Sequence, residues 1–140
     1  MATSSDVHRE AHDAFNRNDA AGMRAILAAD VVGVDHATGR TMEGPDAFIA
    51  WLDEWKTGMS DATVAEPDYL DAGSCSVCRF TGRGTNDGPM GAANATGRSI
   101  ELAFCELVET RDGRIARQEI YYDALGLLAQ LGVVEAPAPA

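Results

Sequence analysis

The feature that most constrains the fold is a nearly continuous series of strand-compatible segments in the second half of the chain. Strand-forming composition recurs in four segments, 63–70, 74–85, 98–110 and 114–122. The last two are joined across Asp112-Gly113, and an Asp-Gly pair readily adopts the positive φ angles of a type I′ turn. This part of the sequence therefore predicts a run of antiparallel strands, with a tight hairpin between the last two.

The first half of the chain has helical periodicity instead. We expect a first helix capped by Ser4 or Ser5, a second over about 20–28, and a third from 44 to 58 with Pro in its first turn. Between the second and third helices, the valines of 31–34 predict a short strand. The third helix carries one wide apolar stripe, formed by Phe48, Trp51, Leu52 and Trp55.

The order of these elements predicts the fold class. Asp123 begins a final short helix that Gly132 closes, so the chain runs from helices through strands to one more helix. This order is typical of an α+β fold, with helices packed on one face of a curved antiparallel sheet. No repeat or linker interrupts it, so we expect a single domain over 1–134 and a disordered Pro/Ala-rich tail over 135–140.

Composition narrows the classes of partner and the compartment. The chain has 22 acidic and 11 basic residues and a net charge of -11, with no basic patch, which argues against binding to nucleic acids or acidic membranes. No apolar run reaches the roughly 20 residues that span a bilayer, and the first residues do not resemble a signal peptide. Three cysteines are an odd number that suits a reducing compartment. We therefore expect a cytoplasmic protein with small, neutral or apolar ligands.

Two short motifs suggest metal chemistry, and neither predicts a site. Cys75 and Cys78 form a CxxC pair, but they lie in an expected strand, where residues three apart point to opposite faces. His8 and His12 are four apart on the first helix, yet Arg9 stands where a metalloprotease motif needs Glu, and only two ligands are offered. The expectation from sequence is therefore a protein without a metal.

Three segments together carry a resemblance to a known family. They are 80–89 with 95–98 (FTGRGTNDGP and ATGR), 111–115 (RDGRI) and 121–132 (YYDALGLLAQLG). In this order and spacing they resemble the SnoaL-like polyketide cyclases, a branch of the nuclear-transport-factor-2-like fold, and the likeness covers almost the whole chain. It implies a cone-shaped α+β structure, in which the curved sheet and the N-terminal helices enclose a deep apolar cavity.

The resemblance also implies a function. It suggests a lyase or isomerase that needs no cofactor, in which an Asp at the position of Asp123 acts as general acid/base in an aldol ring closure. The ligand would be a small hydrophobic carbonyl compound, such as an aromatic polyketide, and the protein a homodimer or homotetramer. Because this fold is reused for other tasks, a non-catalytic ligand-binding or accessory protein is the alternative.

The residue pattern leaves two interpretations of Asp123 open. Asp is among the best N-cap residues and stands where the final helix needs a cap. A catalytic carboxylate must instead face the apolar cavity, where desolvation raises its pKa. Strand alternation places Asp123 on the face of Tyr121, opposite Ile120 and Tyr122, so it faces outward unless the strand end turns it.

A second carboxylate interrupts an apolar strand face. Glu106 shares that face with apolar residues, and a charge in such a position needs a partner. It is a carboxylate at a strand edge, one paired with Arg79 across the sheet, or a second catalytic carboxylate or acid partner in the cavity. An epoxide hydrolase would need Arg79, Glu106 and Asp123 to point inward together and hold a water molecule.

Arg79 and four further residues are candidates for substrate contacts. His36 follows a strand end where the family often has polar cavity residues, and Asn86 replaces a His that many members carry, so it can only form hydrogen bonds. Tyr121 can reach the cavity if the strand end turns. We expect Trp51 mainly to pack its helix against the sheet, with a contact to substrate as its second role.

Overall fold

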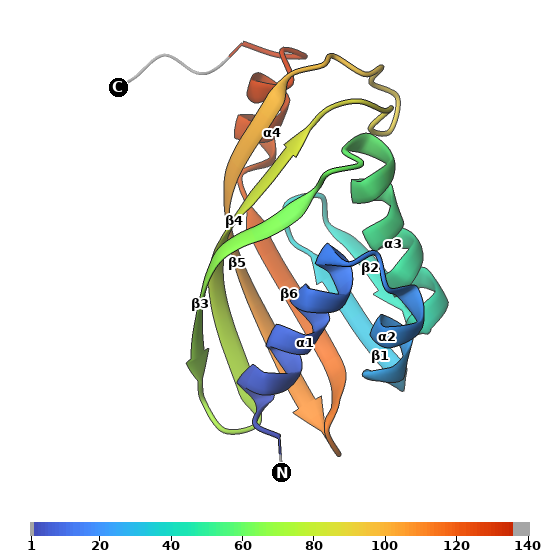
Figure 1. The fold of residues 1–140 in the computed structure, drawn as a ribbon, viewed down its shortest axis with the longest axis vertical. Coiled ribbons are helices and arrows are strands. Elements are labelled where there is room, and N and C mark those ends of the chain that lie inside the picture. Colours follow the sequence, from blue (N-terminus) through green and yellow to red (C-terminus); the bar gives the residue numbers. More distant parts are fainter. Residues whose placement is uncertain (1, 136–140) are drawn as a thin grey trace.

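A computed structural model describes residues 2–135 of the chain. In the first half, helices precede and follow a pair of strands, and four long strands fill most of the second half (Figure 1). In chain order the elements are α1 (Ser4–Asn16), α2 (Ala20–Ala25), β1 (Leu27–Asp35), β2 (Arg40–Glu43), α3 (Gly44–Gly58), β3 (Thr63–Asp71), β4 (Cys75–Thr85), β5 (Ser99–Arg111), β6 (Arg114–Tyr122) and α4 (Ala124–Gln130).

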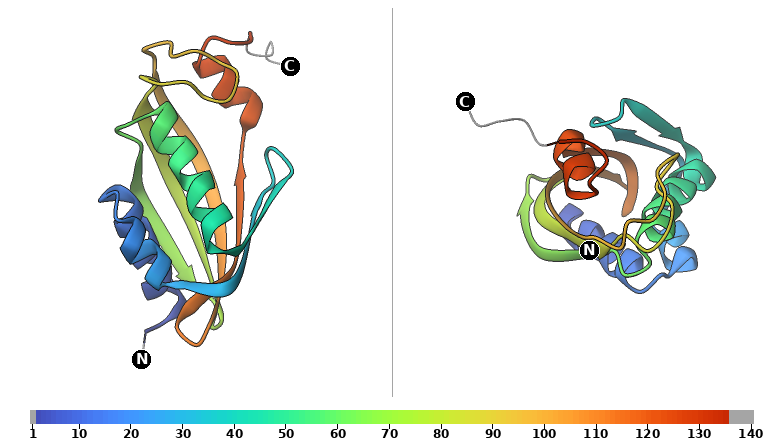
Figure 2. Two further views of the ribbon diagram at one scale, coloured as in Figure 1. Left: turned by 90° about the vertical axis from the view of Figure 1, so that its right-hand side faces the viewer. Right: turned by 90° about the horizontal axis from the view of Figure 1, so that it is seen from above.

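The six strands form one curved sheet that does not close. Their order is β2-β1-β6-β5-β4-β3, so β2 and β3 are the two edges. Neighbouring strands are antiparallel except β1 and β6, which are parallel. Seen from above, the strands curve around one side of the interior, and α1 and α3 lie across the other side (Figure 2).

The predicted α+β fold with a curved sheet and N-terminal helices is confirmed, but the sheet is mixed where an antiparallel one was predicted, because β1 pairs with β6 in parallel. The hairpin between β5 and β6 also has the predicted geometry, because Asp112 and Gly113 have φ angles of 54° and 73°. Helix α3 runs from Gly44 to Gly58 with Pro near its start, as the sequence indicates.

The first half differs from the prediction in three places. Thr3, rather than Ser4 or Ser5, caps α1, in a reciprocal capping box with Asp6. Helix α2 ends at Ala25, and β1 begins at Leu27, because the backbone there pairs with Ile115 of β6. Strand β2 was not predicted, because it has only four residues and forms by pairing with β1 in a hairpin at the edge of the sheet.

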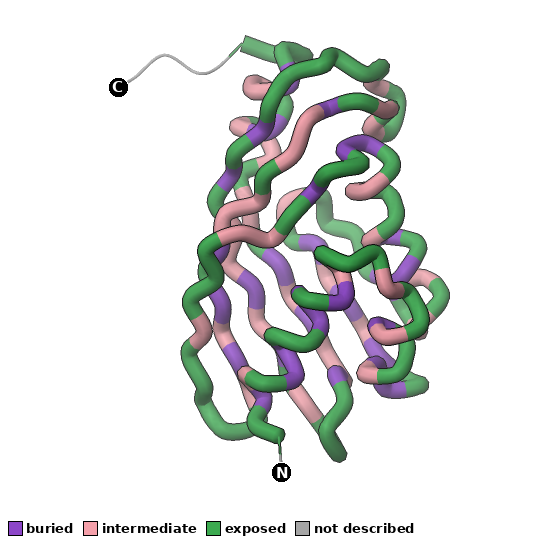
Figure 3. Tube along the Cα trace, in the orientation of Figure 1, coloured by how far each residue is buried: buried purple, intermediate pink, exposed green. Residues whose placement is uncertain are grey.

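Buried residues follow the concave face of the sheet and the sides of α1 and α3 that face it (Figure 3). The core therefore lies between the helices and the sheet, where side chains from the long strands converge. Within residues 2–135, no helix combines the length and the apolar character needed to cross a membrane. The predicted tail falls almost entirely on 136–140, outside the described residues.

Candidate active site

A cavity of about 90 Å³ lies between the concave face of the sheet and helices α1 and α3. Most of the side chains that line it are aliphatic or aromatic. Thr63 and Arg83 are its most exposed lining residues and mark its opening to solvent. Four polar side chains lie deep among the apolar ones: His8, His12, Glu106 and Gln118.

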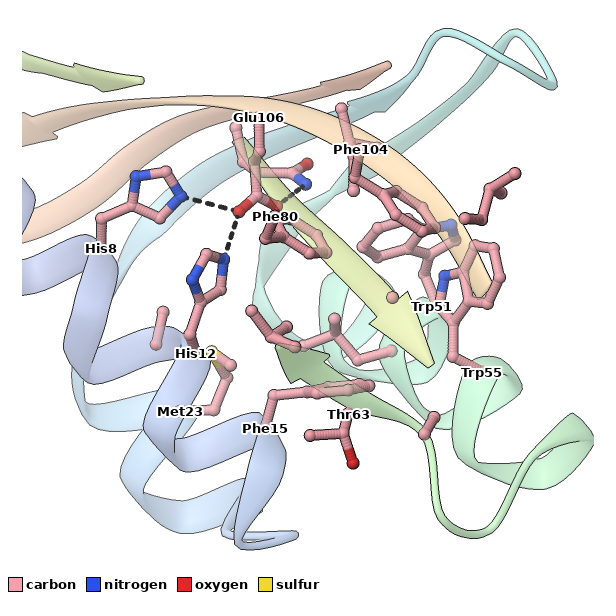
Figure 4. Close-up of a pocket in the computed structure, with 18 of the residues that line it drawn as sticks. His8, His12, Phe15, Met23, Trp51, Trp55, Thr63, Phe80, Phe104 and Glu106 are labelled. Atoms are coloured by element: carbon pink, nitrogen blue, oxygen red, sulfur yellow. Dashed lines mark hydrogen bonds and ion pairs between the residues drawn. The ribbon is translucent and has the colours of Figure 1, made fainter. Parts of the chain in front are cut away.

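Two histidines converge on one carboxylate oxygen in this cavity. His8 and His12 each place Nε2 2.7 Å from Oε1 of Glu106 (Figure 4). All three residues are buried, and His8 is fully so. Because an ionised carboxylate only accepts hydrogen bonds, both Nε2 atoms are donors in this arrangement.

A second layer of polar groups orients the cluster. Ser76 Oγ lies 2.9 Å from Nδ1 of His8, and the Tyr69 hydroxyl lies 2.6 Å from Nδ1 of His12. Gln118 Nε2 donates to Oε2 of Glu106 at 2.7 Å. Every nitrogen of the two imidazole rings and both oxygens of Glu106 thus have a partner, which fixes the ring orientations.

Local structure explains why these residues meet. His8 and His12 are one helical turn apart, so both project from the buried side of α1 toward the sheet. Glu106 on β5 lies between Cys78 of β4 and Ile120 of β6, on the concave face. Gln118 is the diagonal neighbour of Glu106 on β6, within reach of a long side chain.

The cluster stabilises a buried negative charge. Burial raises the pKa of the Glu106 carboxyl, but the hydrogen bonds from His12 and His8 outweigh burial and hold that pKa well below its ordinary value. The carboxyl is therefore ionised at neutral pH. Burial also raises the pKa of Tyr69, so its hydroxyl keeps its proton beside His12.

Aromatic side chains form the rest of the cavity wall. Phe80 and Phe104 stack with their ring centroids 5.0 Å apart, and Trp55 meets Phe104 edge-on at 5.8 Å. Trp51 is held by a hydrogen bond from its Nε1 to Oδ2 of buried Asp35, at 3.1 Å. The polar edge of this indole is therefore occupied, and the remaining wall suits a flat apolar ligand.

Of the residues predicted for the site, Glu106 and Trp51 line the cavity. Glu106 does not pair with Arg79, the alternative that the sequence left open. The Arg79 side chain is 78% exposed and pairs with Asp68. Its guanidinium lies outside the cavity, so a water-holding relay of Arg79, Glu106 and Asp123 is not assembled.

Asp123 lies at the end of β6 and caps α4. Its carboxylate accepts a hydrogen bond of 2.9 Å from the backbone N–H of Gly126. The residue is exposed and is not part of the cavity lining. No bend turns it inward, so the geometry favours the helix cap, and a catalytic role for Asp123 stays a prediction.

The other three predicted contact residues also lie away from the cavity. His36 stacks on Tyr121 at 4.3 Å between ring centroids and pairs with Glu119, so the two rings lie together on the outer side of the sheet. Asn86 is buried in the β4–β5 loop, where its amide donates to the carbonyl groups of Gly58 and Gly88. These hydrogen bonds hold the loop against the end of α3.

Sequence reasoning did not assign His8, His12, Gln118, Tyr69 or Ser76 to the site. The sequence signal for the two histidines is their spacing of four residues on the apolar side of α1. Two histidines alone do not indicate a site, and the third member of the cluster, Glu106, could not be connected to them from sequence. Gln118 had a clearer signal, because strand alternation puts it on the core face with Ile120 and Tyr122.

Comparison with known proteins matches this architecture to one family. The family model described as SnoaL-like polyketide cyclase matches residues 5–131, nearly the whole chain. The chain belongs to the SnoaL-like polyketide cyclase family. A search of curated proteins finds no significant match to this SnoaL-like protein.

Solved structures with the same fold cover almost the full length of this SnoaL-like protein. IdmH from Streptomyces antibioticus, a candidate polyketide cyclase, is 25% identical with a TM-score of 0.82, over 94% of this chain and 99% of its own. A candidate polyketide cyclase from Pseudomonas putida is 23% identical with a TM-score of 0.84, over 94% and 99%. A hypothetical protein with a ketosteroid isomerase-like fold from Catenulispora acidiphila is 22% identical with a TM-score of 0.80, over 98% and 100%.

Proposed function

We propose that this SnoaL-like protein is an enzyme that acts on a small hydrophobic carbonyl compound, with Glu106 as the group that moves the proton. The observation that carries the proposal is the placement of one ionised carboxylate, held by two histidines, in an otherwise largely apolar cavity. Family membership and the candidate polyketide cyclase IdmH, at 25% identity, support a cyclase, lyase or isomerase.

In the proposed reaction, Glu106 removes a proton from a carbon next to a carbonyl group. The electron pair of that C–H bond moves into the enolate, whose carbon then attacks a second carbonyl of the same molecule. The new C–C bond leaves an alkoxide, which takes the proton back from Glu106. His8 and His12, with N–H donors already aimed at the carboxylate, hold its charge before and after the transfer.

The low pKa of Glu106 sets a requirement on the substrate. A strongly hydrogen-bonded carboxylate is a weak base, so the C–H bond must be acidified by carbonyl groups on both sides. A substrate that displaces one histidine hydrogen bond from Oε1 removes a cause that lowers this pKa and leaves burial, which raises it. Binding would therefore make the carboxylate a stronger base at the moment it is needed.

A second candidate function is a non-catalytic binding protein for the same kind of ligand. The observation that favours it is that both histidine rings and both Glu106 oxygens already have partners inside the protein. In this alternative the fully paired cluster fixes the shape of the cavity and takes no part in a reaction. The same apolar and aromatic wall would then bind the ligand without changing it.

Incubation with aromatic polyketide esters of increasing ring number, followed by mass spectrometry and product NMR, distinguishes the two functions. An enzyme converts at least one ester into a cyclised product with repeated turnover. Recovery of every ester unchanged, together with saturable quenching of tryptophan fluorescence by one of them, would assign a binding role. A lack of both turnover and quenching would refute the ligand class itself.

We also propose that the protein forms a homo-oligomer. Its support is a set of large apolar side chains left exposed on β3, β6, α4 and the segment after α4. They are Leu70, Tyr121, Leu125, Leu128, Val133 and Val134. Light scattering coupled to size-exclusion chromatography tests the proposal, and a monomer across the concentration range would contradict it.

A further inference from the structure

His8, His12 and Glu106 have a geometry that goes beyond acid–base chemistry. Each offers one ligand atom, and the three atoms lie within 4.8 Å of one another. Two histidines one helical turn apart plus a carboxylate from a neighbouring element make a ligand set that binds zinc and other first-row transition metals. The two nitrogen ligands select against Mg²⁺ and Ca²⁺, which prefer oxygen.

We propose that Nε2 of His8, Nε2 of His12 and a carboxylate oxygen of Glu106 form a binding site for one divalent transition-metal ion, of which Zn²⁺ matches this ligand set best. The proposal goes beyond the proposed function, since binding of the ion can be measured with no substrate present. It also departs from the expectation of a metal-free site, because the third ligand comes from β5, almost a hundred residues after the histidines.

The outer partners of the three residues fit a metal site. A metal-binding imidazole usually donates its other N–H to a polar group, and a metal-binding carboxylate is usually held by a hydrogen bond of its own. Here Ser76 and Tyr69 lie against the two Nδ1 atoms, and Gln118 donates to the second oxygen of Glu106. Hydroxyl groups both donate and accept, so these partners serve the rings equally well when the protons move from Nε2 to Nδ1.

Metal binding requires the ligand atoms of the three residues to move slightly apart. In a tetrahedral zinc site with bonds of about 2.1 Å, ligand atoms lie about 3.4 Å apart. The two Nε2 atoms now lie 2.7 Å from Oε1 of Glu106, so each separation must widen by roughly 0.7 Å. A small rotation of the Glu106 side chain is the movement that metal binding would require.

Charge and access favour a bound cation. The cluster holds a buried carboxylate inside a protein of net charge -11. All three residues also line the cavity, so an ion bound to them would border the space where a ligand would bind. An ion there would act as a Lewis acid on a substrate carbonyl.

The test is titration of the full-length protein, after dialysis against a chelator, with Co²⁺ and then Zn²⁺. We expect one ion per chain, visible Co²⁺ d–d absorption that Zn²⁺ abolishes, and a rise in melting temperature with Zn²⁺. Glu106→Gln and His12→Gln should each lose affinity by on the order of a hundredfold or more, and Ser76→Ala by about 10- to 100-fold.

His36→Gln is the matched control, because His36 also pairs with a glutamate, Glu119, at 2.8 Å, but outside the cavity. It should bind Zn²⁺ as the wild type does. The proposal is wrong if the wild type takes up no stoichiometric ion, if Glu106→Gln and His12→Gln bind as tightly as wild type, or if His36→Gln removes binding. Circular dichroism identifies a variant that fails to fold, and the Zn²⁺-dependent shift in wild-type melting temperature then decides the question alone.

Discussion

The substitution Glu106→Gln should destabilise the protein by an amount that depends on pH. The carboxylate accepts three hydrogen bonds, from His8, His12 and Gln118. A hydrogen bond to a charged group contributes about 1.5–3 kcal/mol and a neutral one about 0.5–1.5 kcal/mol, so the loss is about 1 kcal/mol per bond. An uncharged amide costs less to bury than a carboxylate, which offsets part of this total of about 3 kcal/mol. We expect a net loss of about 1–2 kcal/mol at neutral pH.

The amide should fit without rearrangement of the backbone. Its oxygen replaces Oε1 as acceptor for the two histidines, and its NH₂ group then faces Nε2 of Gln118. Gln118 can turn its own amide over, because its Oε1 is buried and has no hydrogen-bond partner within the described part of the chain. The fold of the variant is therefore retained, and the stability difference reports the charge.

The pH dependence has a definite sign. The pKa of Glu106 in the folded protein lies below its ordinary value of 4.5. Ionisation of Glu106 therefore stabilises the wild type fully at pH values above 4.5. This stabilisation is lost as the pH falls from 4.5 toward the folded-state pKa. Urea denaturation followed by circular dichroism, with chelator present and at a series of pH values, measures this difference. Equal stabilities at neutral pH, or a difference that grows on acidification, would refute the reasoning.

Two further substitutions test the packing around the site, both by urea denaturation. Gly33→Ala should lower the free energy of unfolding by about 1–3 kcal/mol, because the added Cβ would lie 2.8 Å from Cδ2 of buried Phe48. An unchanged urea midpoint would contradict this close contact. Asp35→Ala should lower the free energy of unfolding by about 2–6 kcal/mol, since Trp51 Nε1 and the Tyr122 hydroxyl would each lose their buried acceptor. A loss below about 1 kcal/mol would show that water replaces the carboxylate.

The fold was predictable because its signals are local. The Asp-Gly turn, the strand-forming segments and the helix that starts at Gly44-Pro45 each depend on a few neighbouring residues, and the structure has them all. Of the three deviations, the early start of β1 depends on pairing with β6, a segment distant in sequence, whereas β2 is a four-residue strand that pairs with the neighbouring β1. The contact of Leu27 with Ile115 is an example that no local pattern contains.

The site was harder to predict because it is made by long-range contacts. Glu106 could be singled out as a charge on an apolar face, but its partners on α1 lie about a hundred residues earlier in the chain. Position alone could not decide whether Asp123 turns inward, and the structure has it capping α4. Asn86 and His36 are polar residues with hydrogen-bond partners elsewhere, which sequence cannot separate from residues that face a cavity.

The most direct test of the account compares Glu106→Gln with Asp123→Asn in kcat/KM on the same polyketide ester. Asn also caps helices well, so the second variant keeps its fold while losing the carboxylate. We expect Glu106→Gln to lower kcat/KM by a factor on the order of 10²–10⁴, whereas Asp123→Asn stays near the wild type. A loss confined to Asp123→Asn would contradict the placement of the reaction at the His8–His12–Glu106 cluster.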